Sequence, residues 1–266
     1  MKNRRLAIFL VIFVFLAVVI VLSSAVFSLR SVELRFLSTT SVLTGKESEI
    51  VESGNFKIGE NVFFSTKENY IKQMEKANPY VRIVNIETVF PNKFIVNAVE
   101  RNETYVIKMD NNKYVKTDEY MKVLSVSSVF QNSTTNGIVI NGSGLSGQTV
   151  EAGDFFKTDG DYLTALFNCF REWDLSYANL KAKIESIELN YNNDPYRLLV
   201  YMRSGVQIVV RKSNRNLSDK LNLAFSFYDT KEDKSHNPVD YTKSGIIEVF
   251  ENESKIYASY RQVKDN

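Results

Sequence analysis

The sequence predicts an α+β fold, in which a single N-terminal transmembrane helix precedes a small strand–helix–helix–strand–strand domain and a larger mixed β domain with packed helices. Three observations lead to this prediction: an uncharged apolar run near the N-terminus, a compact stretch in which apolar periods of 2 and 3.6 alternate, and a longer region of short strands and polar turns. The predicted parts are a cytoplasmic tail at 1–5, a transmembrane helix at 6–29, a first domain at 30–102 and a second domain at 103–266.

The first element is the apolar run. Residues 6–29 contain no charged side chain, and at 1.5 Å per residue they would span roughly 36 Å as a helix, which is enough to cross a bilayer core. The cluster of Lys2, Arg4 and Arg5 outweighs Arg30, so the N-terminus should stay in the cytoplasm and the rest should be exported. A cleaved signal peptide is the alternative, because small residues follow at 23–25. The length of the run favours an uncleaved anchor.

The first domain should begin with a strand and a short helix. Val32, Leu34 and Phe36 alternate, as expected for a strand with one buried face. Thr44 followed by Glu47 matches a capping box, which predicts the start of a short helix, and Gly54 suits the position just after its end.

A second helix and a hairpin should complete this domain. Ser65 and Glu68 form another capping-box match, and Asn78-Pro79 should end the helix, because a residue before proline avoids the helical region. The strand-like runs 80–88 and 93–101 flank a turn at Pro91-Asn92. The expected apolar stripe of the helix and inner face of the second strand consist of Tyr70, Ile71, Met74, Ala77, Phe94, Val96 and Ala98.

The second domain should be mainly β. Its predicted strands are 105–109, 113–116, 120–124, 138–140, 184–191, 196–202, 206–211, 245–250 and 255–260. Two helices should pack on them, one from Asp159 to about Arg171 and one at 217–228.

Composition argues against several classes of function. The net charge is +2, but the first 30 residues hold four basic and no acidic side chains, leaving 29 Lys+Arg against 31 Asp+Glu, or −2, in the remainder. The exported part is therefore not a basic nucleic-acid binder. One histidine, His236, and one cysteine, Cys169, are too few for a clustered zinc site or an acyl-transfer triad. We expect no enzyme activity, no catalytic residue, no metal and no cofactor.

Several short sequence motifs in the first domain resemble those of one known family. They are Gly59-Glu60-Asn61-Val62-Phe63, Asn78-Pro79-Tyr80-Val81, Phe90-Pro91 and Val99-Glu100-Arg101. In this order, after an apolar run, they resemble the POTRA domain of the bacterial cell-division family FtsQ/DivIB. Two positions depart from the family pattern: Glu248 stands where the family has aspartate, and the Asp-x-x-Gly word after the hairpin is 116–120 here, without glycine.

The resemblance implies a scaffold protein of the divisome, located in the cell membrane at the division septum, with its C-terminal domain extracellular or periplasmic. It also implies partners, namely the single-span coiled-coil proteins FtsL and FtsB (DivIC), one of which adds a strand to the terminal β edge. Carried onto this chain, the partner-binding residues are Ile246, Glu248, Phe250, Ile256, Tyr257, Ala258 and Tyr260.

Two alternatives stay open at this level. One is a membrane-anchored POTRA-type binding module of a transport or secretion system, and the other is an exported enzyme. The aromatic residues near the C-terminus could equally pack on the late helix, because one face of each strand must do so.

Overall fold

The structure is a computed structural model, and it describes residues 12–15, 25–39, 43–109, 112–130, 137–142, 149–157, 161–177, 180–190, 194, 196–229 and 244–263. The chain divides into two compact units, Met1–Arg101 and Asn102–Asn266. Most of the predicted transmembrane run at 6–29 lies outside the described residues. Among the residues that are described, no helix has the length and apolar character needed to cross a membrane.

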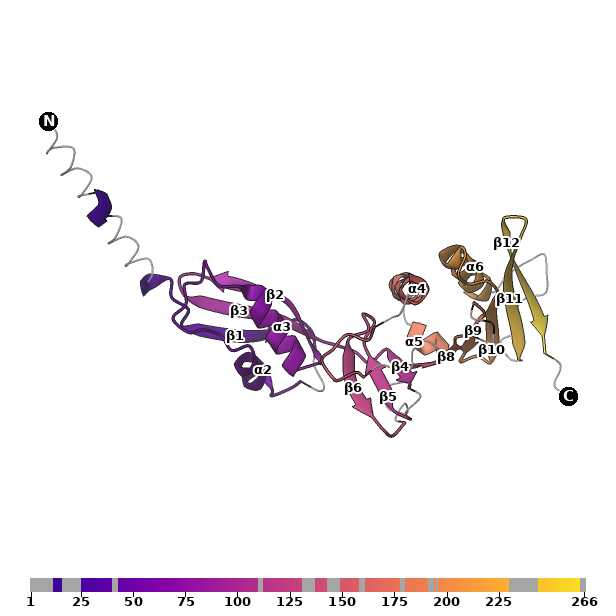
Figure 1. The fold of residues 1–266 in the computed structure, drawn as a ribbon, viewed down its shortest axis with the longest axis horizontal. Helices are drawn as coiled ribbons and strands as arrows, with labels where there is room; N and C mark the ends of the chain where they lie inside the picture. Colours follow the sequence, from indigo (N-terminus) through magenta and orange to yellow (C-terminus); the bar gives the residue numbers. More distant parts are fainter. Residues whose placement is uncertain are drawn as a thin grey trace, which may run out of the picture. The chain divides into compact units, whose positions relative to one another are not determined.

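Unit 1 holds five elements in the order strand, helix, helix, strand, strand, as predicted (Figure 1). They are β1 Ser31–Phe36, α2 Glu47–Ser53, α3 Lys67–Ala77, β2 Val81–Val89 and β3 Lys93–Glu100. The sheet order is β1-β3-β2, with β1 parallel and β2 antiparallel to the central strand. The central strand is apolar on its inner face, where Phe94, Val96 and Ala98 are fully buried. Tyr70 and Met74 of α3 are buried in the same core, whereas Ala77 is exposed.

Both predicted capping boxes are wrong. Helix α2 begins at Glu47 after Lys46, and α3 begins at Lys67 after Thr66, and neither start has a side-chain cap hydrogen bond. The Ser65 hydroxyl instead donates to the Val62 carbonyl at 3.3 Å, so it stabilises the preceding turn rather than the helix. The end of α3 is as predicted, at Asn78, whose side-chain amide donates to the Met74 carbonyl and to Ser53 of α2.

Gly54 follows α2 for a different reason from the one predicted. Its φ is −71°, so it does not need the left-handed conformation that usually places glycine after a helix. A Cβ atom at this position would lie 2.6 Å from the Phe56 ring and 3.1 Å from the Met74 side chain. The glycine is therefore required by close packing between α2 and the core.

A buried ion pair joins α3 to the two long strands of unit 1. The Arg101 guanidinium, 5% exposed, lies 2.9 Å from the Glu75 carboxylate, and its Nε donates to the Val81 carbonyl. The same Glu75 carboxylate accepts the Ile83 backbone N–H at 2.8 Å. One carboxylate thus connects the helix, the start of β2 and the residue after β3.

Unit 2 is organised around a sheet of nine strands (Figure 1). The strands are β4 Tyr105–Lys108, β5 Tyr114–Thr117, β6 Val123–Ser127, β7 Ile138–Asn141, β8 Ile184–Glu188, β9 Leu198–Met202, β10 Val206–Val210, β11 Gly245–Asn252 and β12 Lys255–Gln262. Their spatial order is β12-β11-β10-β9-β8-β7-β4-β5-β6. The helices of this unit are α4 Asp161–Tyr177, α5 Leu180–Lys183 and α6 Leu217–Asp229.

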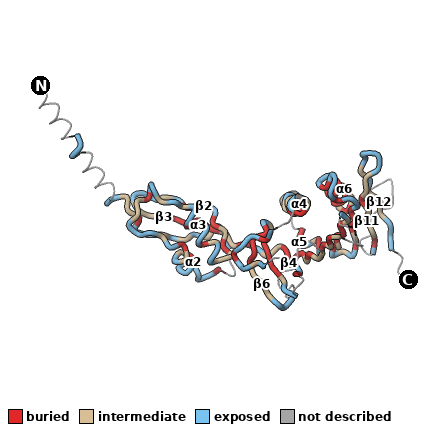
Figure 2. Tube along the Cα trace, viewed as in Figure 1, coloured by how far each residue is buried: buried red, intermediate tan, exposed pale blue. Residues whose placement is uncertain are grey.

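Helices α4 and α6 supply much of the core of unit 2, and Figure 2 shows buried residues concentrated where the helices and strands meet. Leu166 and Phe170 of α4 and Leu221, Ala224 and Phe225 of α6 are fully buried. Both predicted helices thus pack on the core, as expected, although α4 continues six residues past the predicted end at Arg171. Strands β8, β9 and β10, which correspond to the predicted strands at 184–191, 196–202 and 206–211, form an antiparallel meander.

The predicted bounds of the strand at 120–124 are wrong, because β6 starts at Val123 and ends at Ser127. The preceding residues form a turn in which the buried Asp118 carboxylate accepts the backbone N–H groups of Tyr120 and Lys122. Met121 has φ of +63°, the left-handed region that favours glycine. The Asp-x-x-Gly turn is thus present as Asp118-x-x-Met121, with a buried methionine at the glycine position.

Candidate partner-binding edge

Strands β11 and β12 form a regular antiparallel hairpin that runs from Gly245 opposite Gln262 to Asn252 opposite Lys255. The two loop residues, Glu253 and Ser254, have φ of +47° and +65°. Two consecutive residues with positive φ form a type I′ turn, whose twist matches that of the strands it joins. The predicted strands at 245–250 and 255–260 are confirmed as β11 and β12.

Strand β12 lies at one end of the nine-stranded sheet, with β11 as its only strand neighbour among the described residues. The Val263 N–H donates to the Ser244 carbonyl at 2.9 Å, directly across the hairpin. Bonded and non-bonded positions alternate along an antiparallel pair, so every second residue from 255 to 263 turns its backbone groups toward β11. The backbone N–H and C=O groups of Ile256, Ala258 and Tyr260 therefore point away from β11, along the open side of the strand.

The side chains of these three residues face the core. They stand opposite Glu251, Val249 and Ile247 of β11, and all three pack against the hydrophobic core of unit 2. Helix α6 contacts both strands of the hairpin on this face. Of the three aromatic residues near the C-terminus, Tyr260 therefore packs on the core side of the hairpin, whereas Phe250 and Tyr257 do not.

The other four predicted residues share the opposite face of the hairpin. Phe250 and Tyr257 are cross-strand partners whose rings stack with centroids 5.7 Å apart. Ile246 is half-buried, and the Glu248 carboxylate accepts a 2.6 Å hydrogen bond from Arg211 Nε. This side combines an aromatic pair with an ion pair, and Tyr257 is its most exposed aromatic member at 42%.

Glu248 is held by two arginines, since Arg197 approaches the same carboxylate oxygen at 3.7 Å. The longer glutamate side chain, present where the resembled family has aspartate, reaches both guanidinium groups from β11. Sequence reasoning missed both arginines because they come from residues flanking β9 and β10, which only the sheet order brings next to β11.

Lys220 of α6 supports the hairpin from the core side. Its side chain is fully buried, and its Nζ donates to the carbonyls of Arg211 and Lys212 at 3.2 and 2.9 Å. The same amine lies 3.3 Å from the Glu251 carboxylate of β11. This lysine connects the loop after β10 and the β11–β12 hairpin to one helix. The sequence carried no signal for it, because a lysine between Asp219 and Leu221 is expected to be solvated.

Gly245 begins β11 under the Tyr260 ring. A Cβ atom here would lie 2.3 Å from that ring, which is closer than any non-bonded contact allows. We expect Gly245→Val to lower the free energy of unfolding of unit 2 by about 1–3 kcal/mol, the usual cost of overpacking. Urea unfolding followed by the fluorescence of Trp173, the only tryptophan, measures it.

The matched control for Gly245→Val is the same substitution in a Tyr260→Ala background. Removal of the ring should relieve most of the cost of the valine, since the two changes share one contact. Equal costs in the two backgrounds would contradict the packing explanation.

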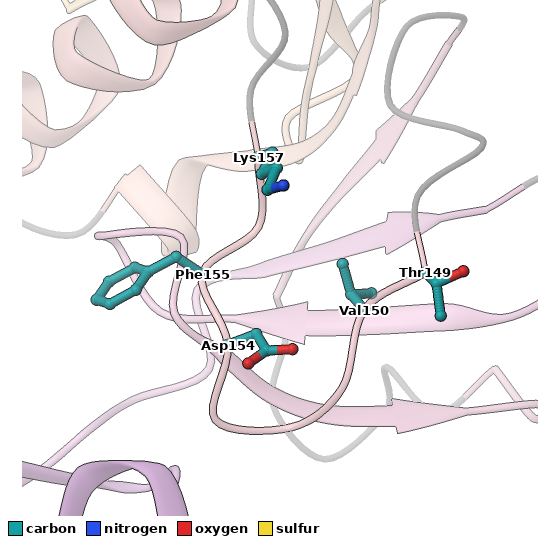
Figure 3. Close-up of a pocket in the computed structure, with 5 residues that line it drawn as sticks. All are labelled: Thr149, Val150, Asp154, Phe155 and Lys157. Carbon is teal, nitrogen blue, oxygen red and sulfur yellow. The ribbon is translucent and has the colours of Figure 1, made fainter. Parts of the chain in front are cut away.

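Figure 3 shows a pocket outside this edge, lined by Thr149, Val150, Asp154, Phe155 and Lys157. All five residues belong to one segment, and the Phe155 ring points away from the charged groups of the other side chains. Phe155 is exposed, with the Lys122 amine 4.5 Å from its ring centroid. The pocket contains no histidine or cysteine. Across the described part of the chain, no three His, Cys, Asp or Glu side chains converge as metal ligands would.

Cys169 lies inside α4 and is buried in the core of unit 2. Burial raises the pKa of its thiol, and the nearby Glu172 carboxylate raises it further. A buried thiol with a raised pKa is a poor nucleophile, so Cys169 acts as an apolar core residue. His236 and the loop around it lie outside the described residues.

Comparison with known proteins gives one consistent result. Three proteins named cell division protein DivIB are similar to this chain. The DivIB of Clostridium tetani (strain Massachusetts) is 24% identical over 208 residues, which cover 77% of this chain and 71% of that protein. The DivIB proteins of Clostridium botulinum strains Hall and Loch Maree are 30% and 29% identical over 117 residues, which cover 43% of each chain. The match thus spans less than half the length of the two botulinum relatives. No family model matches the sequence.

Proposed function

This chain is related to the FtsQ/DivIB family of cell-division proteins, and from that premise we propose that it is a non-catalytic scaffold of the septum. In this proposal residues 6–29 anchor it in the membrane with the N-terminus in the cytoplasm, and residues 30–102 form a POTRA-type module. The second domain binds single-span coiled-coil partners of the FtsL and FtsB/DivIC kind.

The binding mode we propose is strand addition to β12. A partner segment in extended conformation would pair with the outward backbone groups of Ile256, Ala258 and Tyr260, while its side chains meet Phe250 and Tyr257. The observation that carries this proposal is the position of β12 at the end of the sheet, where its outer backbone groups lack a neighbouring strand among the described residues. An unpaired edge of eight residues is a template for a further strand.

Such a scaffold needs no reaction centre. Backbone pairing provides affinity, and the side chains on either face of β12 select the partner. Anchoring of all partners in one membrane confines them to a thin layer, which raises their effective concentration without any new contact.

The alternative is a membrane-anchored module of a transport or secretion system, and it would use the same edge for a different partner. The similarity to three proteins named for cell division favours the first proposal.

Ala258→Pro tests strand addition. Proline removes one outward N–H and leaves the β11 ladder intact, because Ala258 does not bond toward β11. We expect the affinity for the extracellular segment of the coiled-coil partner to fall by at least about tenfold, equivalent to roughly 1.4 kcal/mol. Isothermal titration with the purified partner segment measures it.

Ala258→Ser is the matched control, since it keeps the N–H and is also small. It should bind like the unsubstituted chain. Native circular dichroism must be retained in both variants. Undiminished binding by a folded Ala258→Pro chain would remove β12 as the pairing edge.

A further inference from the structure

Unit 1 carries an exposed apolar surface at one end. We call it the entry patch and define it by six residues that come from three separate segments. These are Val26, Phe27, Ile58, Phe63, Phe64 and Phe90. Phe64 is 83% exposed, and Ile58, Phe63 and Phe90 are each more than half exposed. Phe27, Phe63 and Phe90 contact one another, Val26 and Phe64 adjoin two of them in the chain, and Ile58 lines a pocket together with Arg30. Exposed apolar side chains grouped in this way mark an interaction surface.

The patch is a built structure rather than a scatter of single residues. The rings of Phe27, Phe63 and Phe90 pack on one another, with centroids 5.1, 5.3 and 6.2 Å apart. They hold each other in place while one side of each remains exposed. The interior of unit 1 does not use these faces, so they are available to a partner.

Backbone hydrogen bonds fix the patch to the point where the chain enters unit 1. The Leu29 N–H donates to Glu60 O and the Val62 N–H to Phe27 O, at 2.8 and 2.9 Å. The Arg30 N–H donates to Asn92 O at 2.8 Å. The turn before Phe63 and the turn after Phe90 are therefore both bonded to residues 27–30. Figure 1 shows the turn between β2 and β3 at the end of unit 1 where β1 begins.

The sequence that precedes Arg30 indicates what the entry patch contacts. Residues 6–29 are uncharged and long enough to cross a bilayer, and the last of them, Leu29, is bonded into the patch. No linker separates the apolar run from the patch. The exposed Arg30 and Lys57 flank it, in the manner of basic residues that border a membrane surface. Glu60, the single acidic residue of 57–64, accepts a 2.6 Å hydrogen bond from Tyr70.

We propose that the entry patch inserts into the outer interface of the lipid bilayer, so that unit 1 rests directly on the membrane. The inference rests on the proposed membrane anchor and adds to it a second, peripheral contact. Aromatic and aliphatic side chains of such surfaces lie about 5–10 Å deep at the headgroup–acyl boundary. The contact would fix the height and tilt of unit 1 relative to the membrane.

Tryptophan quenching by brominated lipid tests this contact in the full chain. The chain is reconstituted into phosphatidylcholine vesicles with bromine on the upper part of the acyl chains, and Phe64→Trp places the probe in the patch. Leu37→Trp is the matched control. Leu37 is also an exposed apolar residue, but it follows the far end of β1, roughly 23 Å from Arg30 at about 3.3 Å per residue. The signal of Trp173 is subtracted with the unsubstituted chain.

We expect the Phe64→Trp chain to lose most of its added fluorescence, and the Leu37→Trp chain to lose none. Ile58→Trp, a second exposed patch position, should behave like Phe64→Trp. Equal quenching at patch and control, or no quenching at either, would overturn the proposal.

Carbonate extraction of the same vesicles distinguishes a failure of the proposed membrane anchor from a failure of the proposed interfacial contact. Retained chains without patch quenching would overturn the interfacial contact alone and leave the anchor in place. Chains released into the supernatant would overturn the anchor, and the patch proposal with it.

Discussion

Lys220→Met should lower the free energy of unfolding of unit 2 by roughly 3 kcal/mol, because it removes the fully buried amine that connects α6 to the loop after β10 and to β11. Methionine has a similar volume and apolar stem, so the change leaves no large cavity. It leaves the Arg211 and Lys212 carbonyl groups without this donor. The Glu251 carboxylate also loses its cation, although partial exposure to solvent reduces that loss.

Urea unfolding followed by Trp173 fluorescence measures this effect, since the indole is buried in unit 2. Glu251→Gln is the control that separates the two contributions. It keeps the lysine bonded to both carbonyls and should cost much less than Lys220→Met. Equal losses in the two variants would instead assign the effect to the ion pair with Glu251. A Lys220→Met chain as stable as the original would mean that water satisfies the two carbonyls.

Glu75→Ala should destabilise unit 1 by about 3–5 kcal/mol, the usual cost of breaking a buried ion pair from one side. The Arg101 guanidinium is 5% exposed and would lose its carboxylate, and the Ile83 N–H would lose its acceptor. Amide hydrogen exchange of β2 and β3, read by mass spectrometry, reports on unit 1 separately from unit 2. The amides of both strands should exchange faster.

Glu75→Gln is the matched control for that prediction. Its amide oxygen can still accept the Ile83 N–H, so only the charge pairing is lost and the effect should be smaller than with alanine. If the two variants exchanged alike, charge pairing with Arg101 would account for the whole effect. Unchanged exchange in both would show that the pair is not a stabilising contact.

The elements of the fold were largely predictable because apolar periodicity records which face of each element is buried. Phe94, Val96 and Ala98 alternate in the sequence and are all buried, and Leu221, Ala224 and Phe225 follow a helical period and are buried too. The starts of α2 and α3 were not predictable. A serine three residues before a glutamate can cap a helix or bond within the preceding turn, and Ser65 does the latter.

The candidate edge could be predicted as a pair of strands but not as a surface. The alternation of 245–250 and 255–260 indicates two faces, yet it does not say which face meets α6. The structure divides the seven predicted residues between the core face and the opposite face, and only the register of β11 with β12 decides this division. Lys220, Arg197 and Arg211 were missed because their contacts join segments that are distant in sequence.

The short pairings of β7 with its two neighbouring strands have a mechanical consequence for the sheet of unit 2. This strand has four residues and pairs in parallel with β4 and β8 over three positions each, fewer than any other pairing in the sheet. On either side of it the strands pair over four or more positions. If one force pulled on β12 and an opposing force held β5 or β6, the tension would act on the β8–β7 pairing and on the β7–β4 pairing. Under tension the sheet should part at β7 first, which would limit the force that this chain can transmit.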